Sequence, residues 1–167
     1  MKMFRKMRRS RQILPEGETR AIIEKTATAV LGVNGDDGYP YTVPVNTVMA
    51  DGKLYFHSAK AGHKIDAIKK DPKVSLSFID REDVVSREYT TYFRSAQVFG
   101  RAMIIEDGEE KEKAFRALCE KFCRSDLDRY DEVMSNEAAR AVIVRVEIEQ
   151  MSGKEAIELV KARNQEE

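Results

Sequence analysis

The sequence predicts one α+β domain, a mostly antiparallel β-barrel of about six strands with peripheral helices. Short runs rich in β-branched and aromatic residues are separated by Gly, Asp and Asn turns, which is typical of strands joined by hairpins. Amphipathic helical patterns are few and stand before, between or after these runs. A length of 167 residues, 42% of them hydrophobic, fits a single domain with a substantial core.

The first half of the chain predicts one helix and three strands. Residues 16–26 predict the helix, with Glu16 and Glu18 at its start. The strands are expected at 28–34, 40–49 and 54–58, in a meander with short hairpin turns. Pro40 and Pro44 cannot donate ladder hydrogen bonds, so the second strand is expected at a sheet edge or a bulge.

The second half alternates helices with longer strands. A helix over 62–70 is expected to end before Pro72. Gly100 permits a bulge or a close backbone approach in the long strand that contains it. The remaining expectations are a strand at 74–79, a charged loop at 80–90, strands at 91–106 and 141–148, an amphipathic helix at 108–123, a shorter helical piece at 126–139, and a tail at 153–167 with helical character.

Composition narrows the function classes. The 29 basic and 29 acidic residues balance to a net charge of +0, which gives no argument for nucleic acid or an anionic membrane as the main partner. No apolar run is long enough to span a bilayer, and the first ten residues lack the apolar segment of a secretory signal. We therefore expect a cytoplasmic protein. The basic arm 1–12 is interpreted as a solvated lead-in or as a segment that packs on an acidic partner subunit, with a nucleic-acid arm as the weaker alternative.

Few residues of the metal-binding types occur. Cys119 and Cys123 lie four apart, on one face of a predicted helix, and do not form a metal quartet. His57 and His63 lie six apart without a cluster of Cys or Glu beside them. We expect no metal site and interpret the cysteines as small, partly buried residues.

The segment 54–68 is the richest in chemistry. It predicts a strand ending at His57-Ser58, a short loop with Gly62, and a helix that begins at His63-Lys64. A hydroxyl, a lysine and a helix N-terminus would then lie within one small volume. Free N–H groups and the positive end of the helix dipole favour an anion there. The sequence therefore predicts a binding site for the phosphate of a cofactor.

These residues also carry a family resemblance. The motifs, in order, are Pro-Tyr-x-Val-Pro-x-Asn, an Asp-Gly turn, Tyr-Phe-His-Ser-Ala, a Gly-x-Lys helix start and Phe-Gly-Arg-Ala. Over residues 8–150 the chain resembles the FMN-binding split barrels, and most closely the pyridoxamine 5′-phosphate oxidase-related branch with Nim-type nitroimidazole-resistance reductases. The resemblance implies a mainly β fold, a six-stranded antiparallel split barrel of Greek-key type with peripheral helices, in one domain over 1–167.

The resemblance also implies a homodimer with FMN at the subunit interface. Ser58 and Lys64 would contact the phosphate, and His63 stands where the oxidases have arginine. His57 matches a Nim-type histidine near flavin and substrate. The remaining implied flavin contacts are Tyr41, Thr42, Val43 and Pro44 along the ring and ribityl chain, and Gln97 of the fifth strand.

The implied activity is an FMN-dependent reduction of a small planar or nitro-aromatic acceptor. His57 would orient the acceptor or give it a proton, because an imidazole ordinarily titrates near neutrality. NAD(P)H is a possible donor, although no Rossmann glycine fingerprint is present. The acidic end of the chain does not match the basic tail of true pyridoxamine 5′-phosphate oxidases. A non-catalytic flavin- or haem-binding protein, for storage or sensing, remains the alternative.

Overall fold

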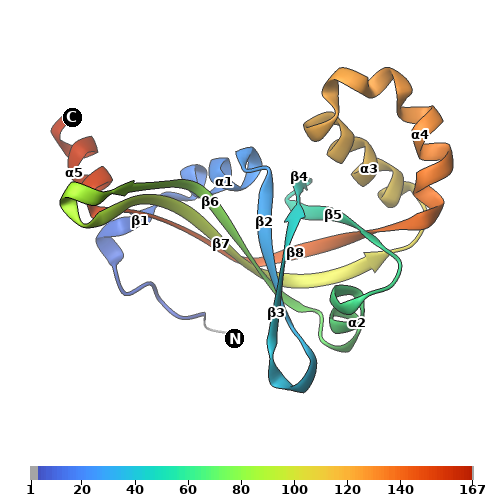
Figure 1. The fold of residues 1–167 in the computed structure, drawn as a ribbon, viewed down its shortest axis with the longest axis horizontal. Coiled ribbons are helices and arrows are strands. Elements are labelled where there is room, and N and C mark those ends of the chain that lie inside the picture. Colours follow the sequence, from blue (N-terminus) through green and yellow to red (C-terminus); the bar gives the residue numbers. More distant parts are fainter. Residues whose placement is uncertain (1–3, 167) are drawn as a thin grey trace.

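The computed structural model describes residues 4–166, so Lys2 of the basic arm lies outside it (Figure 1). The strands are β1 (Ile13–Leu14), β2 (Thr28–Asn34), β3 (Pro40–Asn46), β4 (Val48–Ala50), β5 (Lys53–Ala59), β6 (Lys73–Val85), β7 (Thr90–Ile105) and β8 (Ala141–Glu155). The α-helices are α1 (Glu16–Lys25), α2 (His63–Lys70), α3 (Glu109–Phe122), α4 (Tyr130–Glu137) and α5 (Ile157–Glu166). None of the helices in this range is long and apolar enough to cross a membrane.

The strands form one curled antiparallel sheet in the order β3-β2-β6-β7-β8-β5-β4, with β1 paired to β8. The two ends of the sheet approach each other, because β3 contacts β5. No ladder joins β3 to β5 among the described residues, so the barrel is split between them. The predicted split β-barrel with peripheral helices is therefore confirmed.

The predicted strand 40–49 is in fact two strands. It breaks at Thr47, so that β3 pairs with β2 at one end of the sheet and β4 pairs with β5 at the other. Thr47 is fully buried, and the Lys121 ammonium donates to its carbonyl at 2.8 Å and to that of Thr26 at 3.0 Å. The expected meander is wrong at this point. The edge position predicted from Pro40 and Pro44 is confirmed, since β3 ends the sheet.

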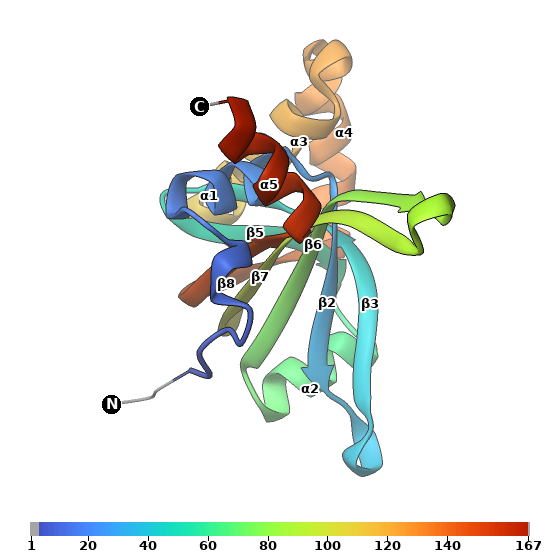
Figure 2. The ribbon, with the colours of Figure 1, turned by 90° about the vertical axis from the view of Figure 1, so that its left-hand side faces the viewer.

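The predicted loop 80–90 is too long, because only residues 86–89 connect the two strands. Residues 81–85 of β6 pair with residues 90–94 of β7 and extend the hairpin into a two-stranded ribbon that projects from the barrel (Figure 2). One of the charges that suggested a loop is an ion-pair partner instead, because Asp80 lies 2.5 Å from the Lys25 ammonium and 3.9 Å from the Arg94 guanidinium of β7. In the same way β8 continues to Glu155, past the predicted end at residue 148, and only then does α5 begin.

Two apolar clusters hold the strands and helices together. The barrel core joins fully buried side chains from β2, β5, β6, β7 and β8, namely Leu31, Leu54, Phe56, Leu76, Phe78, Val98 and Val144. A second cluster, Tyr55, Ala114, Phe115, Leu118 and Ile143, packs α3 against β5 and β8. The side chains of β5 therefore serve both clusters, with alternate residues on opposite faces.

A polar clamp fixes α3 over this second cluster. The Tyr55 hydroxyl donates to Glu110 at 3.1 Å, and Arg145 donates to both Glu110 oxygens at 3.0 Å. Burial, followed by the hydrogen bond and the charge of Glu110, raises the pKa of Tyr55 to about 12. The phenol is therefore uncharged at neutral pH and keeps its donor. The clamp sets the distance between α3 and β5, which matters for the site below.

Candidate functional site

The split between β3 and β5 leaves backbone groups free at the middle of the molecule. β5 pairs with β8 from Leu54 to Ala59, but its other edge is paired with β4 only from Lys53 to Tyr55. β3 pairs only with β2. Beyond Tyr55, two strand edges in the described chain therefore offer unpaired N–H and C=O groups, which a ligand can use.

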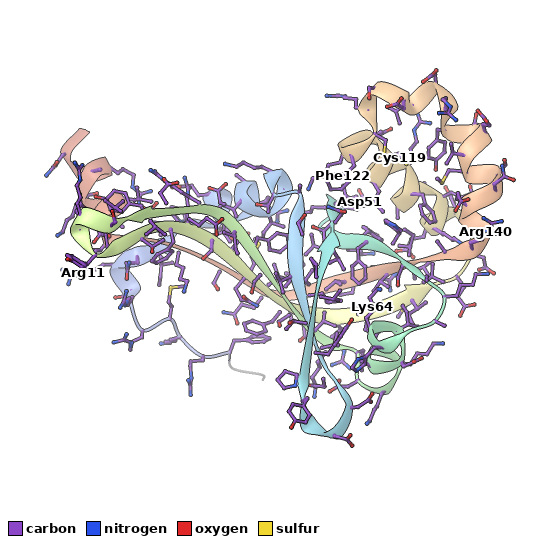
Figure 3. All side chains as sticks on the ribbon, in the orientation of Figure 1. Arg11, Asp51, Lys64, Cys119, Phe122 and Arg140 are labelled. Atoms are coloured by element: carbon purple, nitrogen blue, oxygen red, sulfur yellow. The ribbon has the colours of Figure 1, made fainter. Side chains whose placement is uncertain are left out.

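The N-terminus of α2 lies next to this opening in the chain. Gly62 has a φ of 125°, and no side chain caps the helix there. The first backbone bonds run from Ile65 and Asp66 to the Gly62 carbonyl, so the N–H groups of His63 and Lys64 precede the helical ladder. Lys64 is half-buried, and its ammonium has no partner among residues 4–166 (Figure 3). An anion is the ligand that this arrangement suits.

Ser58 supplies the strongest sign of an absent ligand. Its side chain is only 4% exposed, and its hydroxyl has no hydrogen-bond partner within the described chain. Leaving such a hydroxyl unpaired costs about 1–3 kcal/mol, so buried polar groups normally have a partner. Ser58 shares the barrel-facing side of β5 with Leu54 and Phe56. An acceptor at the mouth of the barrel, such as a phosphate oxygen, would satisfy it.

The His63 side chain contacts two neighbouring side chains. Its ring packs on Tyr41 of β3 with centroids 4.1 Å apart, and its Nε2 lies 3.5 Å from Asp36. Gly35 makes room for this contact, because a Cβ there would lie 3.3 Å from Nε2 and 2.6 Å from the Tyr39 carbonyl. The ring thus ties α2 to the β2–β3 turn and borders the opening.

The four predicted residues of β3 divide between two faces. Tyr41 and Val43 pack against the barrel core, while Thr42 and Pro44 face outward. Thr42 lines a shallow cavity of about 290 Å³ on the outer face, together with Ser75 and Phe99. A single ligand bound to one chain can contact all four of these residues only if it lies along the edge of β3.

His57 and Ser58, adjacent in sequence, also point to opposite faces. The His57 ring lies 6.5 Å from the ring of Phe115, on the side of β5 that α3 covers. There it lines a cavity of about 440 Å³ between β5 and the α3–α4 pair. The structure therefore brings Tyr41 and His63 together and places Lys64 beside His63 at the start of α2, whereas Ser58 and His57 lie on opposite faces of β5.

Gln97 is not brought to this group within one chain. It lies on the outward face of β7, where the Ser77 hydroxyl donates to its side-chain oxygen at 2.5 Å. It lines a cavity of about 380 Å³ with Met7, Ser152 and Lys154. A flavin contact from Gln97 therefore requires a second copy of the chain and stays a prediction.

Sequence reasoning missed the cavity beside His57. The apolar stripe of helix 108–123 predicted contact with the core, and Phe115 and Leu118 do make it. Phe122, on the same stripe, is 38% exposed and lines the cavity with Cys119. The sequence signal for this cavity was Phe122, an aromatic residue at the end of the apolar stripe that the core does not cover. No group of three or more His, Cys, Asp or Glu in residues 4–166 is arranged to hold a metal.

Comparisons with known proteins agree with this architecture. A family model described as pyridoxamine 5′-phosphate oxidase matches residues 15–155. A solved structure from Bacteroides thetaiotaomicron, described as a candidate 5-nitroimidazole antibiotic resistance protein, is 25% identical with a TM-score of 0.69, covering 85% of each chain. An FAD-binding protein from Mesorhizobium loti is 25% identical with a TM-score of 0.65, covering 87% of this chain and 97% of that one.

The flavocytochrome Anf3 from Azotobacter vinelandii shares the fold at 20% identity, with a TM-score of 0.76 over 90% of this chain and 72% of that one. A sequence search of curated proteins finds no significant match. The family model covers most of the chain, and the resemblance read from the 54–68 segment points the same way. The chain belongs to the pyridoxamine 5′-phosphate oxidase family.

Proposed function

We propose that this protein binds FMN at the opening between β3 and β5 and is an oxidoreductase for small planar acceptors. The unpaired, buried hydroxyl of Ser58 carries the proposal, because it needs an acceptor at the barrel mouth. The uncapped N-terminus of α2 and the Lys64 ammonium suit a single terminal phosphate, which favours FMN over a dinucleotide. Relatives described as FAD-binding support a flavin in general.

Different residues of the chain would bind the cofactor and act on the acceptor. Lys64 and the first N–H groups of α2 would hold the phosphate, and Ser58 would donate to it. The unpaired edges of β3 and β5 would hydrogen-bond the ring system. A bound flavin supplies the two-electron chemistry. His57, behind β5, would orient the acceptor and donate a proton from its imidazole N–H as negative charge builds there. NAD(P)H remains the proposed donor.

Lys64→Ala is expected to weaken FMN binding by about 10–100-fold, since a charge-assisted phosphate contact contributes roughly 1.5–3 kcal/mol. The measurement is fluorescence titration of flavin-free protein with FMN. Lys69→Ala, an exposed lysine in the last turn of α2, is the matched control and should bind as wild type does. Riboflavin, which lacks the phosphate, should bind wild type and Lys64→Ala equally. Equal FMN affinity for wild type and Lys64→Ala would show that Lys64 does not bind the phosphate.

We also propose that the working unit is a homodimer formed by the outward sheet face. That face exposes apolar side chains on β2, β6 and β7, with Val30 38%, Ile79 54% and Phe99 39% exposed. Gln97 and Thr42 lie on the same face, so pairing would bring Gln97 of one copy towards the other. Phe4 of the basic arm stacks on Phe99 at 5.5 Å and would join the interface.

Analytical ultracentrifugation tests the dimer. At micromolar concentration the flavin-loaded protein should sediment as twice the chain mass, and Phe99→Glu, which places a charge on the face, should shift it to the monomer. A matched charge at Val133, exposed on α4 away from this face, should leave the dimer intact. A folded, FMN-loaded wild-type monomer would exclude the proposal.

A non-catalytic flavin or haem protein is the second candidate. Its favouring observation is the His57 imidazole, which lies 6.5 Å from the Phe115 ring and lines a largely apolar cavity. Such an imidazole could ligate a haem iron. The absorption spectrum of the purified protein separates the candidates, because haem and flavin bands differ.

A further inference from the structure

The end of α3 brings two thiols together. Cys119 lies in the last turn of this helix and Cys123 is its C-cap residue, whose N–H donates to the Cys119 carbonyl at 2.7 Å. Both side chains line the cavity of about 440 Å³ between β5 and the α3–α4 pair. Cys119 is half-buried and Cys123 is exposed (Figure 3 labels Cys119 on α3). Solvent therefore reaches at least one thiol of a neighbouring pair.

The backbone at Cys123 suits a bond between the two sulfurs. Inside a helix, Cβ atoms at this spacing are about 5–6 Å apart, which is longer than the roughly 3.8 Å across a disulfide. One of the two residues must therefore leave helical geometry before the sulfurs can join. Cys123 has already left it, since its φ of −127° lies outside the helical range. Its place at the end of α3 also lets it move without disturbing the helix interior.

The two thiols differ in protonation and in access. Burial, followed by the charge of Cys123 and a hydrogen bond with it, raises the pKa of the Cys119 thiol. Cys119 therefore keeps its proton at neutral pH. Cys123 is the sulfur that a dissolved oxidant reaches first, because it is the exposed one. An accessible attacking sulfur with a second thiol beside it is the arrangement in which an internal disulfide closes.

Metal binding does not account for the pair. His57 lines the same cavity, but no group of three or more His, Cys, Asp or Glu in residues 4–166 is arranged to hold a metal. The proposed flavin-dependent reduction does not use either thiol. What remains is chemistry that needs two sulfurs only.

We propose that Cys119 and Cys123 are a reversible thiol–disulfide pair, oxidised by a low-molecular-weight disulfide. The Cys123 thiolate attacks one sulfur of the oxidant and breaks its S–S bond, and the departing half takes up the proton that Cys123 lost. Cys119 then gives up its proton and attacks the Cys123 sulfur, and the second half of the oxidant leaves as a thiol. The chain loses two electrons and two protons, and the oxidant becomes two thiols. The disulfide would alter the wall of the cavity that His57 and Asn46 also line.

Equilibration with mixtures of glutathione and glutathione disulfide tests the pair. The full-length protein, as purified, is quenched with acid and analysed by intact mass spectrometry. The wild type should lose two hydrogens per chain, with about tenfold or more internal disulfide than glutathione adduct. Dithiothreitol should reverse the change. Failure to oxidise, an adduct retained on Cys123 while Cys119 stays reduced, or a disulfide between two chains would each overturn the proposal.

Serine variants assign the two steps. Cys119→Ser should retain glutathione on Cys123, because no second thiol is present to displace it. Cys123→Ser should react with glutathione disulfide about tenfold or more slowly than Cys119→Ser, because the remaining thiol is half-buried and protonated. Circular-dichroism melting verifies that both variants are folded. If Cys119→Ser retains no more glutathione than the wild type, Cys119 does not displace it and the proposal is wrong.

Phenylarsine oxide measures the proximity of the two thiols without an oxidant. Its arsenic forms bonds to two neighbouring sulfurs and releases one water, so it should bind one to one to the reduced wild type. Each serine variant should bind it about tenfold or more weakly. Equal binding to the wild type and to the variants would show that the sulfurs do not act as a pair. Tight binding without disulfide formation in the glutathione experiment would leave two close thiols and overturn their redox role.

Discussion

Gly100→Ala is expected to destabilise the protein by about 3 kcal/mol, a large share of the stability of an ordinary domain. A Cβ at this position would lie 2.4 Å from the Glu147 carbonyl oxygen and 2.8 Å from a Val146 methyl group. The register of β7 against β8 shifts between Phe99 and Gly100, where β8 contains one extra residue and so forms a bulge. Urea denaturation followed by circular dichroism measures the change in the free energy of unfolding.

Gly17→Ala is the matched control for this prediction. Gly17 lies in the first turn of α1, and a Cβ there would meet nothing within 4 Å. Alanine is a better helix former than glycine, so this variant should be as stable as wild type or more stable by up to about 1 kcal/mol. If Gly100→Ala also unfolds within about 0.5 kcal/mol of wild type, β8 can move away and the close approach is not a constraint.

His57→Ala is expected to lower the turnover of a neutral nitro-aromatic acceptor by about 10²-fold or more while the flavin content stays close to that of wild type. The reason is the position of His57, which lines the cavity between β5 and the α3–α4 pair, on the face of β5 opposite to Ser58. Steady-state turnover of 4-nitrobenzamide with saturating NADPH gives the rate. Flavin absorbance per chain gives the cofactor content.

His57→Gln separates two roles for the imidazole. Glutamine keeps an N–H donor but cannot transfer a proton, so it should restore acceptor binding and not the rate if His57 is the acid. Recovery of the rate as well would assign His57 to orientation only. Should turnover per bound flavin survive in His57→Ala while flavin content falls, His57 serves the cofactor and the proposed role is wrong.

Local sequence signals were sufficient for several features of the site. Pro72 ended α2 after Lys70, and the loop from Ser58 to Lys64 placed a helix N-terminus after a strand. Pro40 and Pro44 predicted an edge strand because proline lacks the ladder donor. Gly100 predicted the register shift, since a side chain would not fit there. Each of these predictions depends on the covalent structure of a single residue, which restricts the backbone in the same way whatever surrounds it.

Tertiary structure decided what depends on partners distant in sequence. The strand breaks at Thr47 because its two halves pair with β2 and β5, at opposite ends of the sheet, and because Lys121 binds the Thr47 carbonyl. The alternation of apolar and polar residues within one segment does not encode either interaction. Residues 81–85 became strand because they pair with residues 90–94 of β7, and Lys25 of α1 compensates the charge of the neighbouring Asp80.

The division of the site over two faces of β5 has the same origin. A period of two already places His57 and Ser58 on opposite faces of a strand. The sequence therefore determined that the two side chains diverge, together with the helix N-terminus that follows them. Only the packing of α3 and α4 over β5 decided that the His57 side is a cavity and the Ser58 side the barrel mouth, because both faces of this strand are covered.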